Sequence, residues 1–220
     1  ADLSFQEVEV MFSTQLAKNS QLNTLGNSAA CNITINHKYI PSFRLHIVYY
    51  NFPEVGSQTS KVTKSICDKI LNLYKKEYFN FEDSVFVIIN DNVSETLQKS
   101  FDELNIVLRN DFEERELSTE IIDEMSSNKF PLDKKHFRNV NVFTINNITN
   151  NIMEHSLVPK HKAIRNKQEI SEILEKCNCS INQLPIILKN DIISKILRLS
   201  SGDVCEITRI SKKCGEYPFY

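Results

Sequence analysis

The run Ser84–Ile89 constrains the fold of this chain more strongly than any other stretch. It reads SVFVII, so its apolar side chains follow one another without the alternation of a strand that has one face in water. A continuous apolar run of this length is typical of a strand buried on both faces between layers of helix. The sequence therefore predicts an α/β domain that contains this strand.

Further predicted helices and strands lie on both sides of that strand in the sequence. Residues 61–74 carry apolar side chains at helical spacing, with lysines on the opposite face. Ser94 is suited to cap a helix that follows the strand. The β-branched and aromatic composition of Leu45–Tyr50 and Val140–Ile145 predicts two further strands. Other predictions are a weak helix over Phe5–Leu25, a strand within Ile33–Tyr39, a short strand at Ile106–Leu108, and a helix followed by an exposed loop near Ser126–Pro131.

Short segments with well-marked ends follow after residue 150. Val158 precedes a proline, which disfavours the helical conformation and keeps the residue extended. Asn166, with Glu169 three residues later, has the form of a capping box at the start of a helix. Asn190 or Asp191 can cap a second, shorter helix. The chain is then predicted to turn at Ser201–Asp203 and to end in a hairpin with strands at Val204–Ile210 and Glu216–Tyr220.

The difference in pattern between the first 150 residues and the residues after them predicts two domains. Residues 1–150 are expected to form an α/β domain, with a mixed sheet and flanking helices. Residues 151–220 are expected to form a small α+β domain. A chain of 220 residues is long enough for two modest domains of this kind.

Composition narrows the class of function. The formal net charge is −2, whereas a free-standing nucleic-acid-binding protein of high affinity usually has a strong basic excess. This balance still allows a subunit that touches DNA within a larger complex. No apolar run approaches membrane-spanning length, so no membrane partner is expected. The six cysteines lack zinc-site spacing, which predicts reduced thiols and no bound metal.

Two groups of residues are candidates for a catalytic site. Asp83 and Asp91 flank the apolar strand, but no well-placed Glu-x-Lys follows, so we interpret them as solvated carboxylates at the strand ends. His155, Ser156 and His161 lack a glycine-supported nucleophile turn. The sequence also contains no phosphate-binding glycine loop. We therefore expect no catalytic residue and no cofactor, with a nuclease-like DNA-processing enzyme as the alternative.

A series of motifs in the last third of the chain carries a family resemblance. The chain reads EHSLVPKH over Glu154–His161, QLP over Gln183–Pro185, and RISKKCGEY over Arg209–Tyr217, with Asp191 and Gly202 between the last two. In order and spacing these motifs resemble the shared fifth subunit of eukaryotic nuclear RNA polymerases and the corresponding archaeal polymerase subunit. The sequence departs from the family at Lys212, Lys213 and Glu216, which puts any contact made by those positions in doubt.

The resemblance implies a non-catalytic polymerase subunit that binds the largest polymerase subunit through residues 151–220. Such a chain would sit among other polymerase subunits rather than form a homo-oligomer. The partner-binding residues implied by the resemblance are His155, Leu157, Pro159, His161, Gln183, Leu184, Pro185, Asp191, Arg209, Ser211, Gly215 and Tyr217.

A fainter resemblance covers residues 1–150. It implies a lower-jaw domain that looks like a restriction nuclease without an active site and lies beside downstream duplex DNA. The residues implied to lie near DNA are Asn92, Ser94, Thr96 and Lys99. Glu95 replaces the family's proline there, and its carboxylate would repel phosphate; Lys61, Lys64 and Arg109 supply positive charge nearby.

The implied location is the nucleus. The abundance of Asn, Ile and Lys, together with divergence from the family, is consistent with a large DNA virus or a parasitic eukaryote. A cytoplasmic site of viral transcription, or the virion, is therefore the alternative location.

Overall fold

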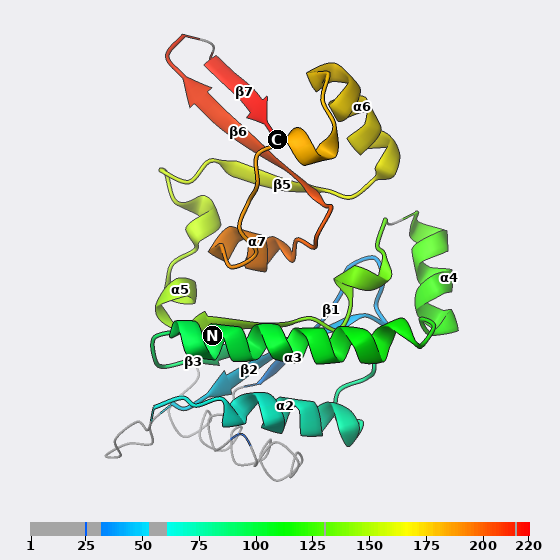
Figure 1. The fold of residues 1–220 in the computed structure, drawn as a ribbon, viewed down its shortest axis with the longest axis vertical. Coiled ribbons are helices and arrows are strands. Elements are labelled where there is room, and N and C mark those ends of the chain that lie inside the picture. Colours follow the sequence, from blue (N-terminus) through cyan, green and yellow to red (C-terminus); the bar gives the residue numbers. More distant parts are fainter. Residues whose placement is uncertain (1–24, 26–31, 53–60, 130, 214) are drawn as a thin grey trace, which may run out of the picture. The chain divides into compact units, whose positions relative to one another are not determined.

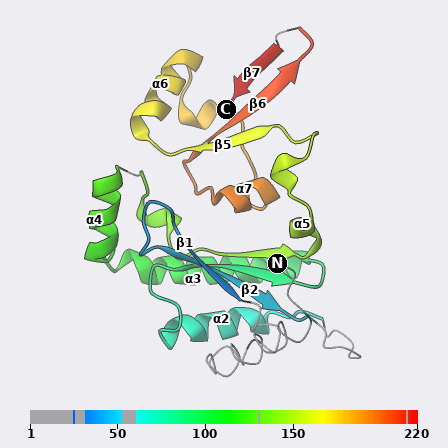
Figure 2. The same ribbon diagram turned by 180° about the vertical axis from the view of Figure 1, so that it is seen from behind.

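The computed structural model describes residues 25, 32–52, 61–129, 131–213 and 215–220 (Figures 1 and 2). The predicted helix over Phe5–Leu25 lies outside these residues, apart from Leu25. The chain divides into two compact units. The first comprises residues 1–128 and 137–145, and the second comprises residues 129–136 and 146–220. The chain therefore enters the second unit briefly before residue 137 and returns to it after residue 145.

The first unit contains a four-stranded mixed sheet in the order β1-β2-β3-β4. β1 is antiparallel to β2, whereas β2, β3 and β4 are parallel. Parallel neighbours need crossover connections, and helices supply them here. The elements are β1 (Ile33–Asn36), β2 (Arg44–Tyr50), α2 (Ser65–Lys75), β3 (Ser84–Ile89), α3 (Glu95–Glu113), α4 (Thr119–Asn128) and β4 (Val140–Thr144).

The predicted central strand is confirmed as β3, which lies between β2 and β4. On one face of the sheet, Val85, Val87 and Ile89 are buried in a core shared with α2 and α3. Helix α3 lies in front of the strands in Figure 1 and behind them in Figure 2, so it covers one face. Ile88, which points to the opposite face, is also buried at 4% exposure. This burial on both faces explains the unbroken apolar run.

Two predictions in this unit were wrong. Ile106–Leu108 belongs to α3 and is not a strand. Its β-branched residues suggest a strand locally, but Leu104, Leu108 and Phe112 form a stripe four residues apart that is buried along the helix, while Ile106 stays 58% exposed. The loop predicted from Ser126 begins later, because α4 continues to Asn128.

The second unit contains a three-stranded antiparallel sheet in the order β5-β6-β7. Its core joins Ile164, Ile173 and Val204, with Leu184 and Tyr220 packed against them. Each buried aliphatic side chain of this size contributes roughly 1.5–3 kcal/mol. The elements are the 3-10 turns η3 (Lys134–His136), η4 (Ile152–Glu154) and η5 (Ile181–Gln183), the helices α5 (Asn146–Thr149), α6 (Lys167–Cys177) and α7 (Ile192–Leu197), and the strands β5 (Lys160–Ile164), β6 (Val204–Ser211) and β7 (Gly215–Phe219).

The predicted helix starts in this unit are largely confirmed. Asn166 caps α6 by accepting a hydrogen bond from the Gln168 N–H at 2.9 Å, but Glu169 pairs with Lys162 at 3.1 Å instead of closing a capping box. Asp191, the second of the two proposed residues, caps α7. None of the described helices is long and apolar enough to cross a membrane.

Candidate functional site

The β5–β6–β7 sheet places five of the predicted partner-binding residues on one face. Residues opposite each other in neighbouring strands share a face, and so do residues two apart along a strand. His161 lies opposite Ile207, and Arg209 lies opposite Tyr217. The same register puts further residues on this surface, which we call the Arg209 face. Its members are His161, Ala163, Cys205, Ile207, Arg209, Ser211, Gly215, Tyr217 and Phe219, of which Cys205 is buried.

The Arg209 face is open toward its β7 edge. Arg209 is exposed, and 36% of Tyr217 is exposed. The guanidinium carbon of Arg209 lies 3.7 Å from the centroid of the Phe219 ring, a stack that contributes about 0.5–1 kcal/mol at an exposed site. Stacking fixes the plane of the guanidinium but leaves its N–H groups available at the edge. Arg209 can therefore donate paired hydrogen bonds to a carboxylate or carbonyl of a partner.

The motif around Pro159 forms a turn followed by a strand. The Val158 N–H donates to the His155 carbonyl at 2.9 Å, and the Leu157 N–H donates to His155 Nδ1 at 3.2 Å. These bonds hold Leu157 at the tip of the turn, where 85% of it is exposed. A loop around His155–His161 was the prediction, but β5 begins at Lys160 because its backbone pairs with β6.

Three of the predicted partner-binding residues have contacts inside their own unit. Gln183 Oε1 accepts from the Ser180 N–H at 2.7 Å and closes η5. Leu184 is partly buried and packs against the core of the second unit. Asp191 Oδ1 accepts from the Ile193 N–H at 2.8 Å and caps α7. These contacts explain the residue types at these positions through folding alone, and contact with a partner stays a prediction for each.

Sequence reasoning missed three of the most exposed apolar side chains of the second unit. Ile186 is 89% exposed, Leu188 is 73% exposed and Ile210 is 80% exposed. Large apolar side chains that remain in water often mark an interaction surface when they occur together. The run Ile186–Leu188 directly after Pro185 was the available signal, since proline prevents a strand or helix from continuing across it and burying the run.

Comparison with known proteins finds relatives for the last third of the chain, which contains the Arg209 face. Residues 150–220 match the family model described as RNA polymerase Rpb5, C-terminal domain. DNA-directed RNA polymerase subunit Rpo5 of Nitrosopumilus maritimus is 41% identical over 69 residues, which cover 31% of this chain and 82% of that protein. Rpo5 of Archaeoglobus fulgidus is 39% identical over 69 residues, which cover 31% of this chain and 90% of that protein. Rpo5 of Thermococcus kodakarensis is 41% identical over 70 residues, which cover 32% of this chain and 84% of that protein.

The chain belongs to the Rpb5 family. It is therefore a non-catalytic subunit of a multisubunit DNA-directed RNA polymerase. The family relationship is carried by the second unit, and the matches to Rpo5 proteins span about a third of the chain.

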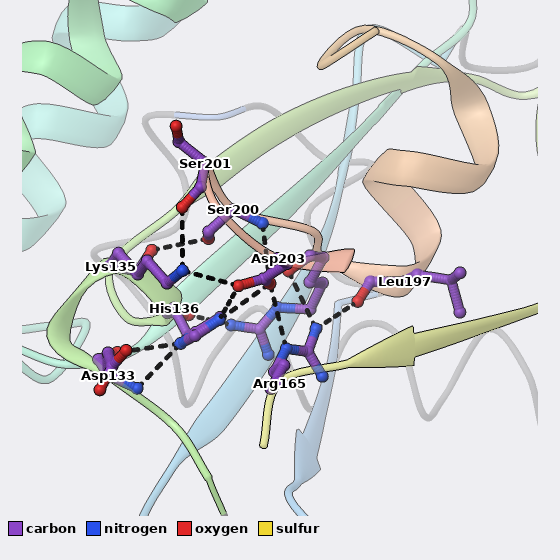
Figure 3. Close-up of polar contacts among 9 residues, drawn as sticks. Asp133, Lys135, His136, Arg165, Leu197, Ser200, Ser201 and Asp203 are labelled. Atoms are coloured by element: carbon purple, nitrogen blue, oxygen red, sulfur yellow. Dashed lines mark hydrogen bonds and ion pairs between the residues drawn. The ribbon is translucent and has the colours of Figure 1, made fainter. Parts of the chain in front are cut away.

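A polar cluster inside the second unit of this Rpb5-family chain was also missed. Figure 3 shows Lys135, His136 and Arg165 converging on Asp203, whose side chain is 1% exposed. The Asp203 carboxylate lies 2.7 Å from Lys135 Nζ, 2.9 Å from His136 Nε2 and 3.3 Å from Arg165 Nε. It also accepts from the Ser200 N–H at 3.1 Å. The cluster ties η3 to the turn before β6.

The electrostatics of this cluster favour the ionised carboxylate. Burial raises the pKa of Asp203, but hydrogen bonds from His136 and Lys135 outweigh burial and hold the pKa well below its ordinary value. Apart from the bond to Ser200, the contacts join residues that are far apart in the sequence, at positions without any shared motif. No pattern of spacing could have paired them before the fold was known.

In the first unit of this Rpb5-family chain, the predicted DNA-proximal residues lie at the start of α3. Ser94 Oγ accepts from the Leu97 N–H at 3.2 Å, which confirms Ser94 as the helix cap. Asn92, Thr96 and Lys99 are exposed around it. Asp91 Oδ2 accepts from the Val62 N–H at 3.3 Å, which brings the segment with exposed Lys61 and Lys64 beside the turn that precedes α3. Their proximity to DNA stays a prediction.

The two carboxylates considered for nuclease chemistry have different environments. Asp83 was expected to be solvated, but it is fully buried and pairs with Arg44 at 2.7 Å and His46 at 2.8 Å. Burial raises the pKa of Asp83, but the hydrogen bonds from His46 and Arg44 outweigh burial, so the pKa lies below its ordinary value. Asp91 lies beyond the other end of β3, roughly 20 Å away by the rise of a six-residue strand. The two carboxylates therefore cannot bind one metal ion, and among the described residues no cluster of three or more potential ligands is found.

Proposed function

We propose that this chain docks on the largest subunit of its RNA polymerase through the Arg209 face of the second unit. The observation that carries the proposal is the common placement of His161, Arg209, Ser211, Gly215 and Tyr217 on one open sheet face. These residues come from two motifs about fifty residues apart, and strand pairing brings them together. The second unit is also the part of the chain that matches Rpo5 proteins.

The chemistry of the Arg209 face suits a protein partner. Tyr217 offers an aromatic ring with a polar tip, and Arg209 offers fixed donors, which are two residue types enriched at the centres of protein interfaces. Leu157, at its exposed turn, adds an apolar side chain that a partner can cover. The partner surface would supply an acceptor for Arg209 and an apolar recess for Tyr217.

The first unit is proposed to form the lower jaw beside downstream DNA. Lys61, Lys64 and Lys99 surround the start of α3, where the helix dipole also favours a phosphate. Glu95, in the first turn of the helix, opposes that attraction. The contact would consequently be weak and dependent on salt, and affinity would come from the assembled polymerase. We propose the nucleus as its location, with a cytoplasmic site of viral transcription as the alternative.

Reconstitution of the polymerase tests the docking surface. The double variant Arg209→Ala/Tyr217→Ala should bind the largest subunit at least tenfold more weakly, because truncating interface centres of this type commonly costs 2 kcal/mol or more, roughly thirtyfold. The matched control is Arg109→Ala/Tyr39→Ala, which removes the same exposed residue types from the first unit. Equal binding by the two double variants would refute docking through the Arg209 face.

A separate measurement tests the jaw. In polymerase that contains Lys61→Gln/Lys64→Gln, the slope of log affinity for downstream duplex DNA against log salt concentration should fall by about 2, since each phosphate contact contributes nearly 1. Lys167→Gln/Lys176→Gln in the second unit is the control with the same charge change. An unchanged slope in the first variant would show that these lysines do not contact DNA.

A further inference from the structure

The chain between η5 and α7 exposes both apolar side chains and backbone. Residues 185–188 belong to no helix, strand or turn, and Figure 1 draws the orange chain leading to α7 without helix or strand. Ile186 is 89% exposed and Leu188 is 73% exposed, although Ile187 between them is half-buried. The exposed pair lies two residues apart, as in a strand that presents one face to a partner.

The two ends of this stretch are fixed within the second unit. At one end Leu184 is extended, with φ −68° and ψ 146°, its side chain packs against the core, and its N–H donates to the Ile181 carbonyl. At the other end the Asp191 N–H donates to the Leu188 carbonyl at 3.0 Å, and Asp191 caps α7. A segment held at both ends loses little conformational freedom when it binds, so it is prepared for recognition.

The backbone of the stretch has donors and acceptors to offer. Among the hydrogen bonds of the described residues, none involves the N–H groups of Ile186, Ile187 or Leu188, or the carbonyls of Pro185, Ile186 and Ile187. Water satisfies such groups while they are exposed, but a partner that covers Ile186 and Leu188 with an apolar surface alone would leave them unpaired. A partner strand satisfies both needs, because its backbone pairs with the groups that point toward it, on every second residue of the stretch, while its side chains cover the apolar ones.

We propose that Pro185–Leu188 pairs with a β-strand of another polymerase subunit. This inference rests on the proposed function, since it specifies how the second unit is held in the polymerase. It adds a second contact, made by the backbone, to the side-chain contact of the Arg209 face. The pairing explains why an apolar run with open backbone groups remains at the surface of a folded domain.

Hydrogen–deuterium exchange on the full chain, free and incorporated into polymerase, tests the pairing. The amides of Ile186, Ile187 and Leu188 should exchange quickly in the free chain. In the polymerase, the amides that point toward the partner strand, either Ile187 alone or Ile186 and Leu188, should exchange at least a hundredfold more slowly. A chain that is incorporated while these amides still exchange quickly overturns the pairing and leaves the proposed function standing. Slow exchange in the free chain that depends on protein concentration also overturns it, because the occupant is then a second copy. Failure of the chain to enter the polymerase refutes the proposed function and the pairing together.

Proline substitutions supply an independent test of strand geometry. Successive N–H groups of a strand point in opposite directions, so only one of Ile186→Pro and Ile187→Pro removes a donor to the partner. Each proline variant is compared with alanine at the same position, which removes the side chain but keeps the N–H. One proline should lower affinity for polymerase lacking this subunit at least tenfold relative to its alanine control, and its neighbour less than threefold. Equal effects of the two prolines, or no effect of either, overturn the pairing.

Discussion

Replacing Asp203 by asparagine should destabilise the second unit by about 3 kcal/mol. Removing one partner of a buried ion pair typically costs 3–5 kcal/mol, because the remaining charge stays uncompensated. The lower end applies here because Lys135 is 29% exposed and can turn to water. Arg165 also keeps a hydrogen bond to the Leu197 carbonyl at 2.8 Å. His136, which is 3% exposed, loses its carboxylate partner and accounts for much of the cost.

Differential scanning calorimetry measures this cost at pH 7. For a chain of this size, about 3 kcal/mol lowers the unfolding midpoint by roughly 6–12 °C. The control is Asp133→Asn, which makes the same chemical change at an exposed position of the same segment. It should alter stability by less than about 0.5 kcal/mol. A shift for Asp203→Asn no larger than that of the control would refute the argument that the cluster stabilises the unit.

The pH dependence provides a second check on Asp203. Folding lowers the pKa of Asp203, so the folded state favours the carboxylate. The resulting stabilisation is fully present above about pH 5 and declines as the pH falls below about 4, toward the folded pKa. The difference in midpoint between the original chain and Asp203→Asn should therefore shrink progressively below pH 4. A difference that stays constant down to pH 2.5 would contradict a role for the ionised carboxylate.

Three further predictions follow from the first unit and the exposed turn. Asp83→Asn should lower stability by about 3 kcal/mol, since Arg44 loses a buried partner. The control Asp91→Asn should cost under about 1 kcal/mol. Equal calorimetric shifts of the two variants would contradict the role given to the burial of Asp83. Ser94→Ala should lower the free energy of unfolding by about 1 kcal/mol, and Ser94→Asp should keep it near the original value, as measured by urea unfolding. Equal stability of the two variants would contradict the capping role of Ser94. Leu157→Ser should leave the midpoint within about 2 °C yet weaken incorporation into polymerase; intact incorporation would exclude a contact there.

Local patterns predicted the elements whose cause is itself local. The apolar run of β3, the Ser94 cap of α3 and the Asn166 cap of α6 all depend on neighbours within a few residues, and each was found where expected. Prediction failed at Ile106–Leu108, where the β-branched residues suggested a strand. The helical pattern becomes visible only over the longer stretch from Leu97 to Phe112. It failed also at Asp83, because its partners Arg44 and His46 come from another strand.

The sequence by itself determined the alternation of strands and helices, the family of the last third of the chain, and the residue types available for binding. Only the tertiary structure decided which of these residues share a surface. Strand register placed His161 on the same face as Arg209 and Tyr217, and folding packed Leu184 against the core while leaving Ile186 in water. The physical reason is that helix caps and apolar periodicity act between near neighbours, whereas burial and ion pairing depend on which distant segments meet.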